Sequence, residues 1–211
     1  MVTAWGQAVI DLQAREQGQP VVNIRGAKVA LGPLHRDMLP VLERWENDLR
    51  TADLGGGDPR SMTAATVAAE WEPLLGGERP DWLGFAIYAL PELRLIGHAN
   101  LRDFSNSHGT AEIGISLGDV GTRGKGYGTE AVWLLLDFAF QHLNVWNVWL
   151  DTAAYNYGAI RAYEKAGFRE IGRRRGARVV GGTRHDIVLM DCTHDDFYEM
   201  FPQGRESATS G

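Results

Sequence analysis

The sequence of 211 residues lacks several features that define common protein classes. Cys192 is the only cysteine, so no disulfide can form within the chain, and we expect a reducing, cytoplasmic setting. No apolar run approaches the roughly 20 residues that a membrane-spanning helix needs, which predicts no membrane partner. Near the N-terminus, Asp11 interrupts the best apolar stretch and no basic region precedes it, so we predict no signal peptide.

An excess of positive charge is also missing. The chain has 21 Lys and Arg residues against 27 Asp and Glu residues, for a net charge of -6. Broad binding to nucleic acid phosphates needs a basic face, so we predict no nucleic acid partner. A cationic small molecule is better suited as the binding partner of this acidic chain. The six histidines form no His-x-x-x-His or Cys/His cluster, and we therefore predict no metal site.

The order of the hydrophobic patterns predicts a single α+β domain. The length suffices for one sizeable core but is short for two. We expect an N-terminal appendage, helical at most in part, over residues 1–23, and a folded domain over residues 24–195. A C-terminal tail over residues 196–211 is expected to be disordered at its end.

Within the domain, the period of the apolar residues changes along the chain. An extended segment and two helices come first, followed by three consecutive β-rich runs that predict an antiparallel meander. A helix that is apolar almost all round comes next, then a strand, a short helix and two last strands. These expected elements cover residues 21–31, 37–48, 61–75, 82–90, 93–101, 112–117, 129–142, 145–153, 156–167, 168–174 and 184–192.

A glycine-rich turn precedes the apolar helix, in the sequence TRGKGYGTEA at residues 122–131. Free backbone N–H groups and the positive end of a helix dipole converge at such a turn, which predicts a bound phosphate or pyrophosphate. A Walker A loop would need Gly at 119 and Ser or Thr at 126, but the chain has Asp119 and Gly126. A dinucleotide fingerprint would need its third glycine where Thr129 stands. Both motifs are excluded.

The remaining pattern, Arg-x-x-Gly-x-Gly at Arg123, Gly126 and Gly128, resembles that of the Gcn5-related N-acetyltransferase (GNAT) superfamily. AEIGISLGDVGTRGKGYGTEA resembles the family's fourth strand, pyrophosphate loop and third helix, and NYGAIRAYEKAGF resembles its second acyl-CoA signature. KVALGPLHRDMLPVLERWEND resembles its opening strand and helix. The likeness covers roughly residues 24–195. It is most similar to the branch with the ribosomal-protein N-terminal (alanine) acetyltransferases, whose last strands often read like RHDIVLM.

The resemblance implies the GNAT fold, a mixed and mostly antiparallel central sheet of about seven strands. Helices would cover both faces, and the fourth and fifth strands would splay apart. It also implies acetyl-CoA as co-substrate, no metal, and transfer of the acyl group to a primary amine by direct attack in a ternary complex. Cys192 is expected on the last strand, away from the thioester, which disfavours a covalent cysteine intermediate.

The resemblance also assigns cofactor contacts. Backbone groups of the fourth strand would pair with the pantetheine arm, and N–H groups from Lys125 to Thr129 would hold the pyrophosphate. The predicted cofactor-binding residues are Ile115, Ser116, Leu117, Arg123, Gly124, Lys125, Gly126, Tyr127, Gly128, Thr129, Asn156 and Ile160.

Two side chains are candidates for proton transfer. By the resemblance, Tyr163 would protonate the coenzyme A thiolate, and a phenol of pKa about 10 suits a thiol of pKa about 8.5. The alternative for Tyr163 is an aromatic that packs the helix on the sheet. Glu112 is a candidate base, because a carboxylate in a partly dry cleft has a raised pKa. Glu112 is equally explained as an exposed or paired acid, with water carrying the proton.

Other residues have weaker claims on the acceptor side. His98, Asn100 and His108 fall on or near the strand and loop before Glu112. Asp186 lies in the last hairpin, where it would face the amine or lie on a strand edge. Trp71 and Trp82 flank a glycine- and proline-rich loop that would roof a cleft.

The acceptor stays open at this stage. A small-molecule amine or a protein N-terminus fits, as does an amino-sugar antibiotic, and a larger acyl group is an alternative to acetyl. A non-catalytic acyl-CoA-binding or regulatory module is the alternative from a different class. The oligomeric state, including a homodimer, is also open.

Overall fold

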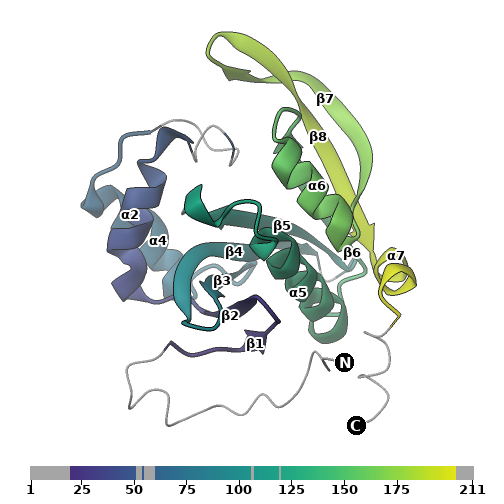
Figure 1. Cartoon of the computed structure of the whole chain (residues 1–211), viewed down its shortest axis with the longest axis horizontal. Coiled ribbons are helices and arrows are strands. Elements are labelled where there is room, and N and C mark those ends of the chain that lie inside the picture. The colour runs from purple at the N-terminus through teal and green to yellow at the C-terminus, as the bar shows by residue number, and fades with distance from the viewer. Residues whose placement is uncertain (1–19, 51–53, 55–59, 106, 119, 203–211) are drawn as a thin grey trace.

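The computed structural model describes residues 20–50, 54, 60–105, 107–118 and 120–202. It contains one sheet of eight strands in the order β1-β2-β3-β4-β5-β6-β8-β7, with helices on both sides (Figure 1). The predicted appendage, residues 1–23, lies mostly outside the described residues. Within the described part, no helix is long and apolar enough to cross a membrane.

The strands follow the predicted order. Five antiparallel neighbours, β1 to β5, are followed by the parallel pair β5–β6 and the antiparallel pairs β6–β8 and β8–β7. The strand count exceeds the expected seven because a turn at Gly26 divides the first extended segment in two. The strands are β1 (Ile24–Arg25), β2 (Val29–Pro33), β3 (Trp82–Ala89), β4 (Arg94–Ser105), β5 (Thr110–Leu117), β6 (Asn147–Ala153), β7 (Arg169–Val180) and β8 (Thr183–Thr193).

The parallel pair β5–β6 splays apart, as predicted. Their register contains only the pairs from Thr110 with Asn147 to Glu112 with Trp149, although β5 continues to Leu117. The second half of β5 therefore presents an edge that β6 does not cover.

Two helical layers cover the sheet. The main core joins one face of the sheet to α5, α6 and α7, and a second cluster packs α2 against α4 on the opposite side (Figure 1). Alternation along β2 separates the faces, because Val29 and Leu31 belong to the main core whereas Ala30 packs with Ala86 and Tyr88. The helices are α2 (Leu39–Glu46), α4 (Ala64–Leu75), α5 (Tyr127–His142), α6 (Tyr157–Ala166) and α7 (His194–Met200).

Helix α5 forms the centre of the main core. Eight of its sixteen residues are buried, in agreement with the apolar pattern that predicted a buried helix. Its deepest side chains, Leu134, Leu135 and Leu136, are at most 2% exposed. The helix is therefore fixed to the sheet along its length, which holds its N-terminus and the preceding glycine turn in place.

The folded domain extends further than the predicted boundary at residue 195. Helix α7 begins at His194, and Thr193 caps it by accepting a hydrogen bond from the N–H of Asp196. Phe197 and Tyr198 of this helix are buried in the main core. The sequence pattern missed this helix because it has only seven residues.

The predicted caps of α6 are confirmed. The Asn156 side chain accepts a hydrogen bond from the N–H of Ala159 at 3.2 Å. Gly167 ends the helix with a φ of 114°, in the left-handed region that favours glycine. These caps fix the length of α6 and thereby the position of Tyr163 in its last turn.

Glu130 of α5 connects the helix to the β1–β2 turn. Its carboxylate accepts three backbone hydrogen bonds, from the N–H groups of Ala27, Lys28 and Val29 at 2.9, 2.7 and 2.8 Å. We expect Glu130→Ala to lower the free energy of unfolding by about 2 kcal/mol, because hydrogen bonds to a charged group are lost. Urea denaturation measures this change.

The matched control is Glu164→Ala, which removes an exposed acid from α6. We expect this variant to stay within about 0.5 kcal/mol of the parent, as for most surface substitutions. Equal denaturation midpoints for the two variants would contradict the role given to Glu130.

Candidate active site

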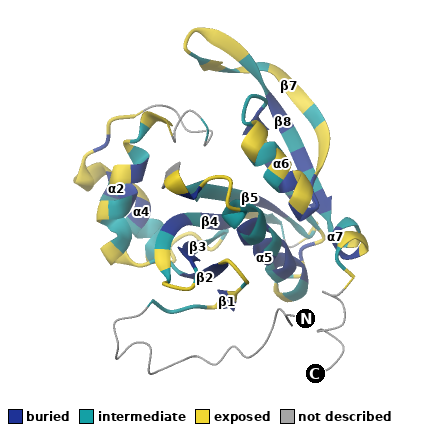
Figure 2. Cartoon of the chain, in the orientation of Figure 1, coloured by how far each residue is buried: buried dark blue, intermediate teal, exposed yellow. Residues whose placement is uncertain are grey.

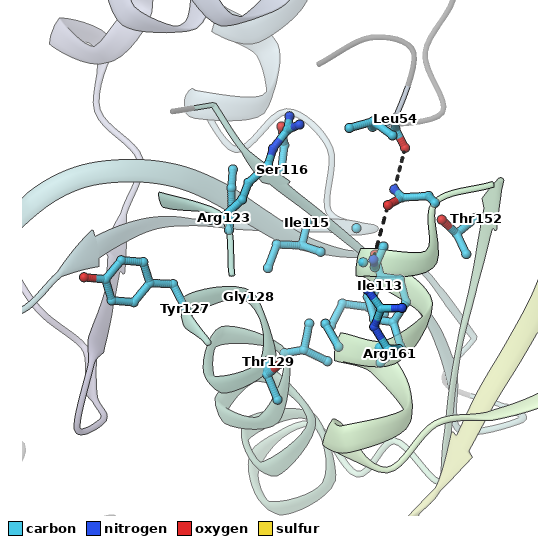
Figure 3. Close-up of a pocket in the computed structure, with 18 of the residues that line it drawn as sticks. Leu54, Ile113, Ile115, Ser116, Arg123, Tyr127, Gly128, Thr129, Thr152 and Arg161 are labelled. Carbon is cyan, nitrogen blue, oxygen red and sulfur yellow. Dashed lines mark hydrogen bonds between the residues drawn. The ribbon is translucent and has the colours of Figure 1, made fainter. Parts of the chain in front are cut away.

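A cavity of about 520 Å³ opens where β5 and β6 diverge. Its walls come from β4, β5, the glycine turn, the start of α5, the end of β6 and helix α6. In Figure 3, Arg123 and Gly128 lie on one side of the view and Thr152 and Arg161 on the other, with Ile115 between them. The volume is in the range of small-molecule sites, and the walls converge from segments far apart in the sequence.

Most of the predicted site residues line this cavity. Lys125 and Ile160 are the two that do not: Lys125 is exposed and Ile160 packs against the main core. The predicted residues that line it are Glu112, Ile115, Ser116, Leu117, Arg123, Gly124, Gly126, Tyr127, Gly128, Thr129, Asn156 and Tyr163.

The glycine turn delivers the N-terminus of α5 to the cavity. Gly126 is the N-cap, with a φ of 84°, and its carbonyl accepts the first helical hydrogen bond, from Glu130. The first N–H groups of a helix have no acceptor one turn earlier, so those of Tyr127, Gly128 and Thr129 are available to an anion. The turn therefore offers backbone donors of the kind that bind phosphate groups at helix N-termini.

Cations beside the turn extend this anion site. Arg123 lines the cavity from the turn, and Arg161 and Lys165 line it from α6. The Lys28 ammonium group donates a hydrogen bond to the carbonyl of Lys125 at 3.4 Å. Cations therefore line the cavity both at the glycine turn and along α6.

The uncovered edge of β5 forms the wall between the two ends. Ile113 to Leu117 have no register partner on β6, and all five residues of this stretch line the cavity. An unpaired strand edge offers N–H and C=O groups to an extended ligand. This edge suits an amide-containing chain such as pantetheine.

Two hydrogen bonds fix the Asn156 side chain at the N-terminus of α6. Besides capping the helix, its amide group donates to the carbonyl of Leu54 at 3.0 Å (Figure 3). Leu54 comes from the segment between α2 and α4 and also lines the cavity. Asn156 therefore joins the two sides of the cavity wall.

Tyr163 lines the cavity from the last turn of α6. The side chain is 8% exposed and packs edge-on against Phe168, with ring centroids 5.8 Å apart. Burial, together with the nearby carboxylate of Asp151, raises the pKa of Tyr163 to about 12. Its hydroxyl therefore keeps its proton at neutral pH and can act as an acid.

Glu112 lies on β5 and forms an ion pair with Arg102 of β4. Arg102 also donates a hydrogen bond to the Asn100 side chain at 3.2 Å. Burial raises the pKa of Glu112 above its usual value, and the Arg102 guanidinium opposes this rise without cancelling it. Glu112 is thus both a paired acid and a carboxylate with the raised pKa of a base.

His98 borders the cavity beside this ion pair. Its ring lies edge-on to Trp71 at 4.9 Å and stacks on Trp45 at 6.5 Å. Burial lowers the pKa of His98 to about 4, so the imidazole is neutral at pH 7. Among the described residues, its buried Nδ1 has no hydrogen-bond partner.

Several other candidates lie outside the cavity. Trp71 and Trp82, which flank the loop expected to roof the cleft, belong to the α2–α4 cluster and do not line the cavity. Asp186 accepts a hydrogen bond from the N–H of Gly176 and stabilises a β7 bulge. His108 does not reach the cavity.

Cys192 is also remote from the cavity. It is buried in the main core, and burial raises the pKa of its thiol to about 12. Such a thiol is a poor nucleophile. The described residues also contain no group of three or more His, Cys, Asp or Glu side chains that could hold a metal ion.

Four charged cavity residues were missed in the sequence: Arg102, Asp151, Arg161 and Lys165. Arg102 stands two residues after Asn100, so strand alternation places both on one face. Arg161 and Lys165 have the i, i+4 spacing of one helix face. Asp151 has no local signal, because only the pairing of β6 with β5 brings it near Glu112.

Comparison with known proteins agrees with this geometry. A family model described as an acetyltransferase (GNAT) domain matches residues 28–169. The probable N-acetyltransferase YjcK of Bacillus subtilis is 34% identical over 121 residues, which cover 56% of this chain and 66% of that protein. The spermidine N(1)-acetyltransferase of Vibrio cholerae is 30% identical over 96 residues, or 46% of this chain and 55% of that protein.

Solved structures extend the likeness in fold. The crystal structure of spermidine N-acetyltransferase from Vibrio cholerae in complex with CoA and spermine superposes with a TM-score of 0.73 at 21% identity, covering 82% of this chain and 99% of that one. A putative acetyltransferase from T. thermophilus gives a TM-score of 0.69 at 24% identity, with coverages of 87% and 95%. The resemblance to the ribosomal-protein branch stays a prediction. The family model covers more than half of the sequence, and the chain belongs to the GNAT acetyltransferase family.

Proposed function

We propose that the chain transfers the acetyl group of acetyl-CoA to a primary amine by direct attack in a ternary complex. The carrying observation is the cavity at the β5–β6 splay, which brings together an anion-binding helix N-terminus, an open strand edge and the buried acid Tyr163. Each of these features matches one requirement of acyl transfer from a thioester. The CoA and spermine bound to the Vibrio cholerae structure support the same assignment.

The donor would occupy the end of the cavity at α5. N–H groups of Tyr127, Gly128 and Thr129 would hold the pyrophosphate, and Arg123 of the turn would add charge. The β5 edge from Ile115 to Leu117 would hold the pantetheine arm, and the thioester supplies the activated acyl group.

The protein residues then divide the proton transfers. Glu112 would accept a proton from the incoming ammonium group, which leaves a neutral amine to attack the acyl carbon. A backbone N–H of β5 would stabilise the negative charge that develops on the acyl oxygen. Tyr163 would donate its proton to the departing thiolate, and its hydroxyl is protonated at neutral pH.

The acceptor would enter from the Glu112 side. Arg102 already neutralises Glu112, so the exposed carboxylate of Asp151 would attract the ammonium group. A small-molecule amine or a protein N-terminus fits this arrangement, and the single cysteine of the chain favours a cytoplasmic reaction.

An amine panel with acetyl-CoA tests this function, with release of free thiol as the readout. The panel contains polyamines, amino sugars, amino acids and short peptides with free N-termini. Thiol release that depends on the amine supports the proposal. Tight coenzyme A binding in calorimetry without turnover on any amine would instead favour the non-catalytic acyl-CoA-binding module.

The pH dependence tests Glu112. A protonated carboxyl cannot accept a proton, so we expect kcat/KM to fall as the pH drops through the raised pKa of Glu112, above the usual 4.5. Glu112→Gln should lower kcat about 100-fold and remove this acidic limb. The pH profile of kcat/KM for parent and variant measures both effects.

The control for this experiment is Asp191→Asn. Asp191 lies on the same face of the sheet, on β8, and does not line the cavity. Its removal should leave the acidic limb unchanged. An acidic limb that persists in Glu112→Gln would assign the base to another group or to water.

A further inference from the structure

The β7–β8 hairpin concentrates positive charge in an acidic chain. The hairpin, residues 169–193, contains six arginines and three acids, Glu170, Asp186 and Asp191, whereas the whole chain has a net charge of -6. The hairpin projects beyond the body of the sheet, and its outer part is largely exposed (Figure 2). The arginines are Arg169, Arg173, Arg174, Arg175, Arg178 and Arg184. Two of them already form ion pairs, Arg169 with Asp196 and Arg173 with Glu170.

The strand register places Arg174 on the acceptor side of the sheet. Arg174 pairs with Ile187 of β8, and Ile187 pairs with Ala153 of β6. Directly paired residues share a face, and so do alternate residues of one strand. Asp151 lies two residues before Ala153 and lines the cavity, so Arg174 and Asp151 share one face.

The base of the hairpin adjoins the cavity mouth. The N–H of Ala154 donates to the carbonyl of Asp186 at 2.9 Å, and the His185 ring packs edge-on against Tyr155 at 4.7 Å. The next residue, Asn156, lines the cavity. A chain that leaves the cavity on this side therefore meets the hairpin first.

A bulge holds the hairpin in a defined shape. The register shifts between Arg174 and Arg178, and Gly176 inside this bulge has a φ of 58°. The Gly176 N–H donates to the Asp186 carboxylate at 2.9 Å, and Arg184 donates to the Gly176 carbonyl at 3.0 Å. Bulges redirect side chains and occur often beside active sites.

The outer edge of the hairpin is open. β7 is the last strand of the sheet, so within the described chain its outer edge has no neighbour. Ile171 and Val179 on this strand are 59% and 55% exposed. An extended peptide can add to such an edge through main-chain hydrogen bonds, with side chains selecting the partner.

We propose that the acceptor is the N-terminal amine of a polypeptide with acidic side chains near its N-terminus, which dock on Arg174 of the hairpin. This inference rests on the proposed function and narrows its acceptor. Two interstrand steps of about 4.8 Å separate β6 from β7, and an extended chain advances about 3.3 Å per residue. The acidic side chains therefore belong about three to six residues from the amine.

Peptides that differ only in charge test this inference. We compare kcat/KM for eight-residue peptides with the same first two residues and Glu, Gln or Lys at positions three to six. The Glu peptide should exceed the Lys peptide by about tenfold at low salt, and the ratio should shrink at high salt. Arg174→Glu should reduce the ratio to about one, whereas Arg173→Glu should leave it within about twofold.

Arg173 is the control because it lies on the opposite face, opposite Val188 of the main core, and its guanidinium is already paired with Glu170. Equal rates for the Glu and Lys peptides, or equal effects of the two substitutions, would overturn the inference and leave the proposed function standing. A higher kcat/KM for spermidine than for every peptide would also overturn the inference and leave the proposed function standing. A third outcome would also overturn the inference: the parent binds an oligonucleotide, Arg174→Glu abolishes this binding, and kcat/KM does not depend on the charge of the peptide. The hairpin would then be a nucleic acid binding site. No thiol release with any amine would overturn the proposed function itself.

Discussion

Tyr163→Phe is expected to lower kcat about 100-fold while the Kd for coenzyme A stays unchanged. The substitution removes only the hydroxyl, and general acid catalysis typically contributes a factor of this size or more. The phenylalanine ring retains the packing of the parent against Phe168, at 5.8 Å between ring centroids. Thiol release under saturating substrates measures kcat, and calorimetry measures the affinity.

Tyr157→Phe is the matched control for this experiment. Tyr157 lies on the same helix, is 65% exposed and does not line the cavity. It should leave kcat within about twofold, because a surface hydroxyl contributes little. A rate of thiol release that survives Tyr163→Phe undiminished would remove Tyr163 as the acid.

The pH profile adds a second readout for Tyr163. The acid must be protonated to act, and burial raises the pKa of Tyr163 to about 12. Ionisation of Tyr163 therefore produces no fall in kcat until the pH approaches that value. A fall centred near about pH 8, the range of an ordinary thiol or amine, that disappears in the phenylalanine variant would contradict the raised pKa.

The local part of the site could be predicted from the sequence. Gly126 and Gly128 were placed at the start of a helix because their spacing, the preceding strand and the following apolar run agree. Asn156 and Gly167 were placed at the ends of α6 because capping depends on residues within one turn. Predictions of this kind need no knowledge of how distant strands pair.

The charge arrangement of the acceptor side could not be predicted in the same way. Glu112 was identified as a candidate base, but its pairing with Arg102 depends on the antiparallel register of β4 and β5. Asp151 approaches Glu112 only through the parallel pair β5–β6. The sequence shows which residues of a strand share a face, but it does not show which residues of two neighbouring strands lie opposite each other. Both are needed to predict these contacts.

The aromatic residues illustrate a different cause of error. Trp71 was expected to shape a pocket because it flanks a glycine- and proline-rich loop. In the structure Trp71 is 7% exposed and packs with Leu42 and Trp45 between α2 and α4. Burial of a large aromatic side chain outweighed the loop signal, and the neutral ring of His98 contacts Trp71 from the cavity side.

Gly126→Val is expected to weaken coenzyme A binding about 100-fold, or about 2.7 kcal/mol. Gly126 has a φ of 84°, which a β-branched residue adopts only with strain. A Cβ at this position would also lie 3.0 Å from the Lys28 ammonium group, beside the N–H groups proposed to hold the pyrophosphate. Isothermal calorimetry with coenzyme A measures the affinity, and thermal denaturation shows whether the variant still folds.

Two further variants separate strain from filled space. Gly172→Val adds the same side chain to β7, where a Cβ would meet nothing within 4 Å, and it should leave the affinity unchanged. Gly126→Ala keeps the strain of the positive φ but adds only one carbon, which the flexible Lys28 side chain can accommodate. We therefore expect Gly126→Ala to lower the free energy of unfolding by about 1 kcal/mol. Its affinity for coenzyme A should fall less than that of Gly126→Val. The valine side chain would prevent an anion from approaching the backbone at residue 126. Unchanged coenzyme A affinity in Gly126→Val would therefore mean that the pyrophosphate binds elsewhere.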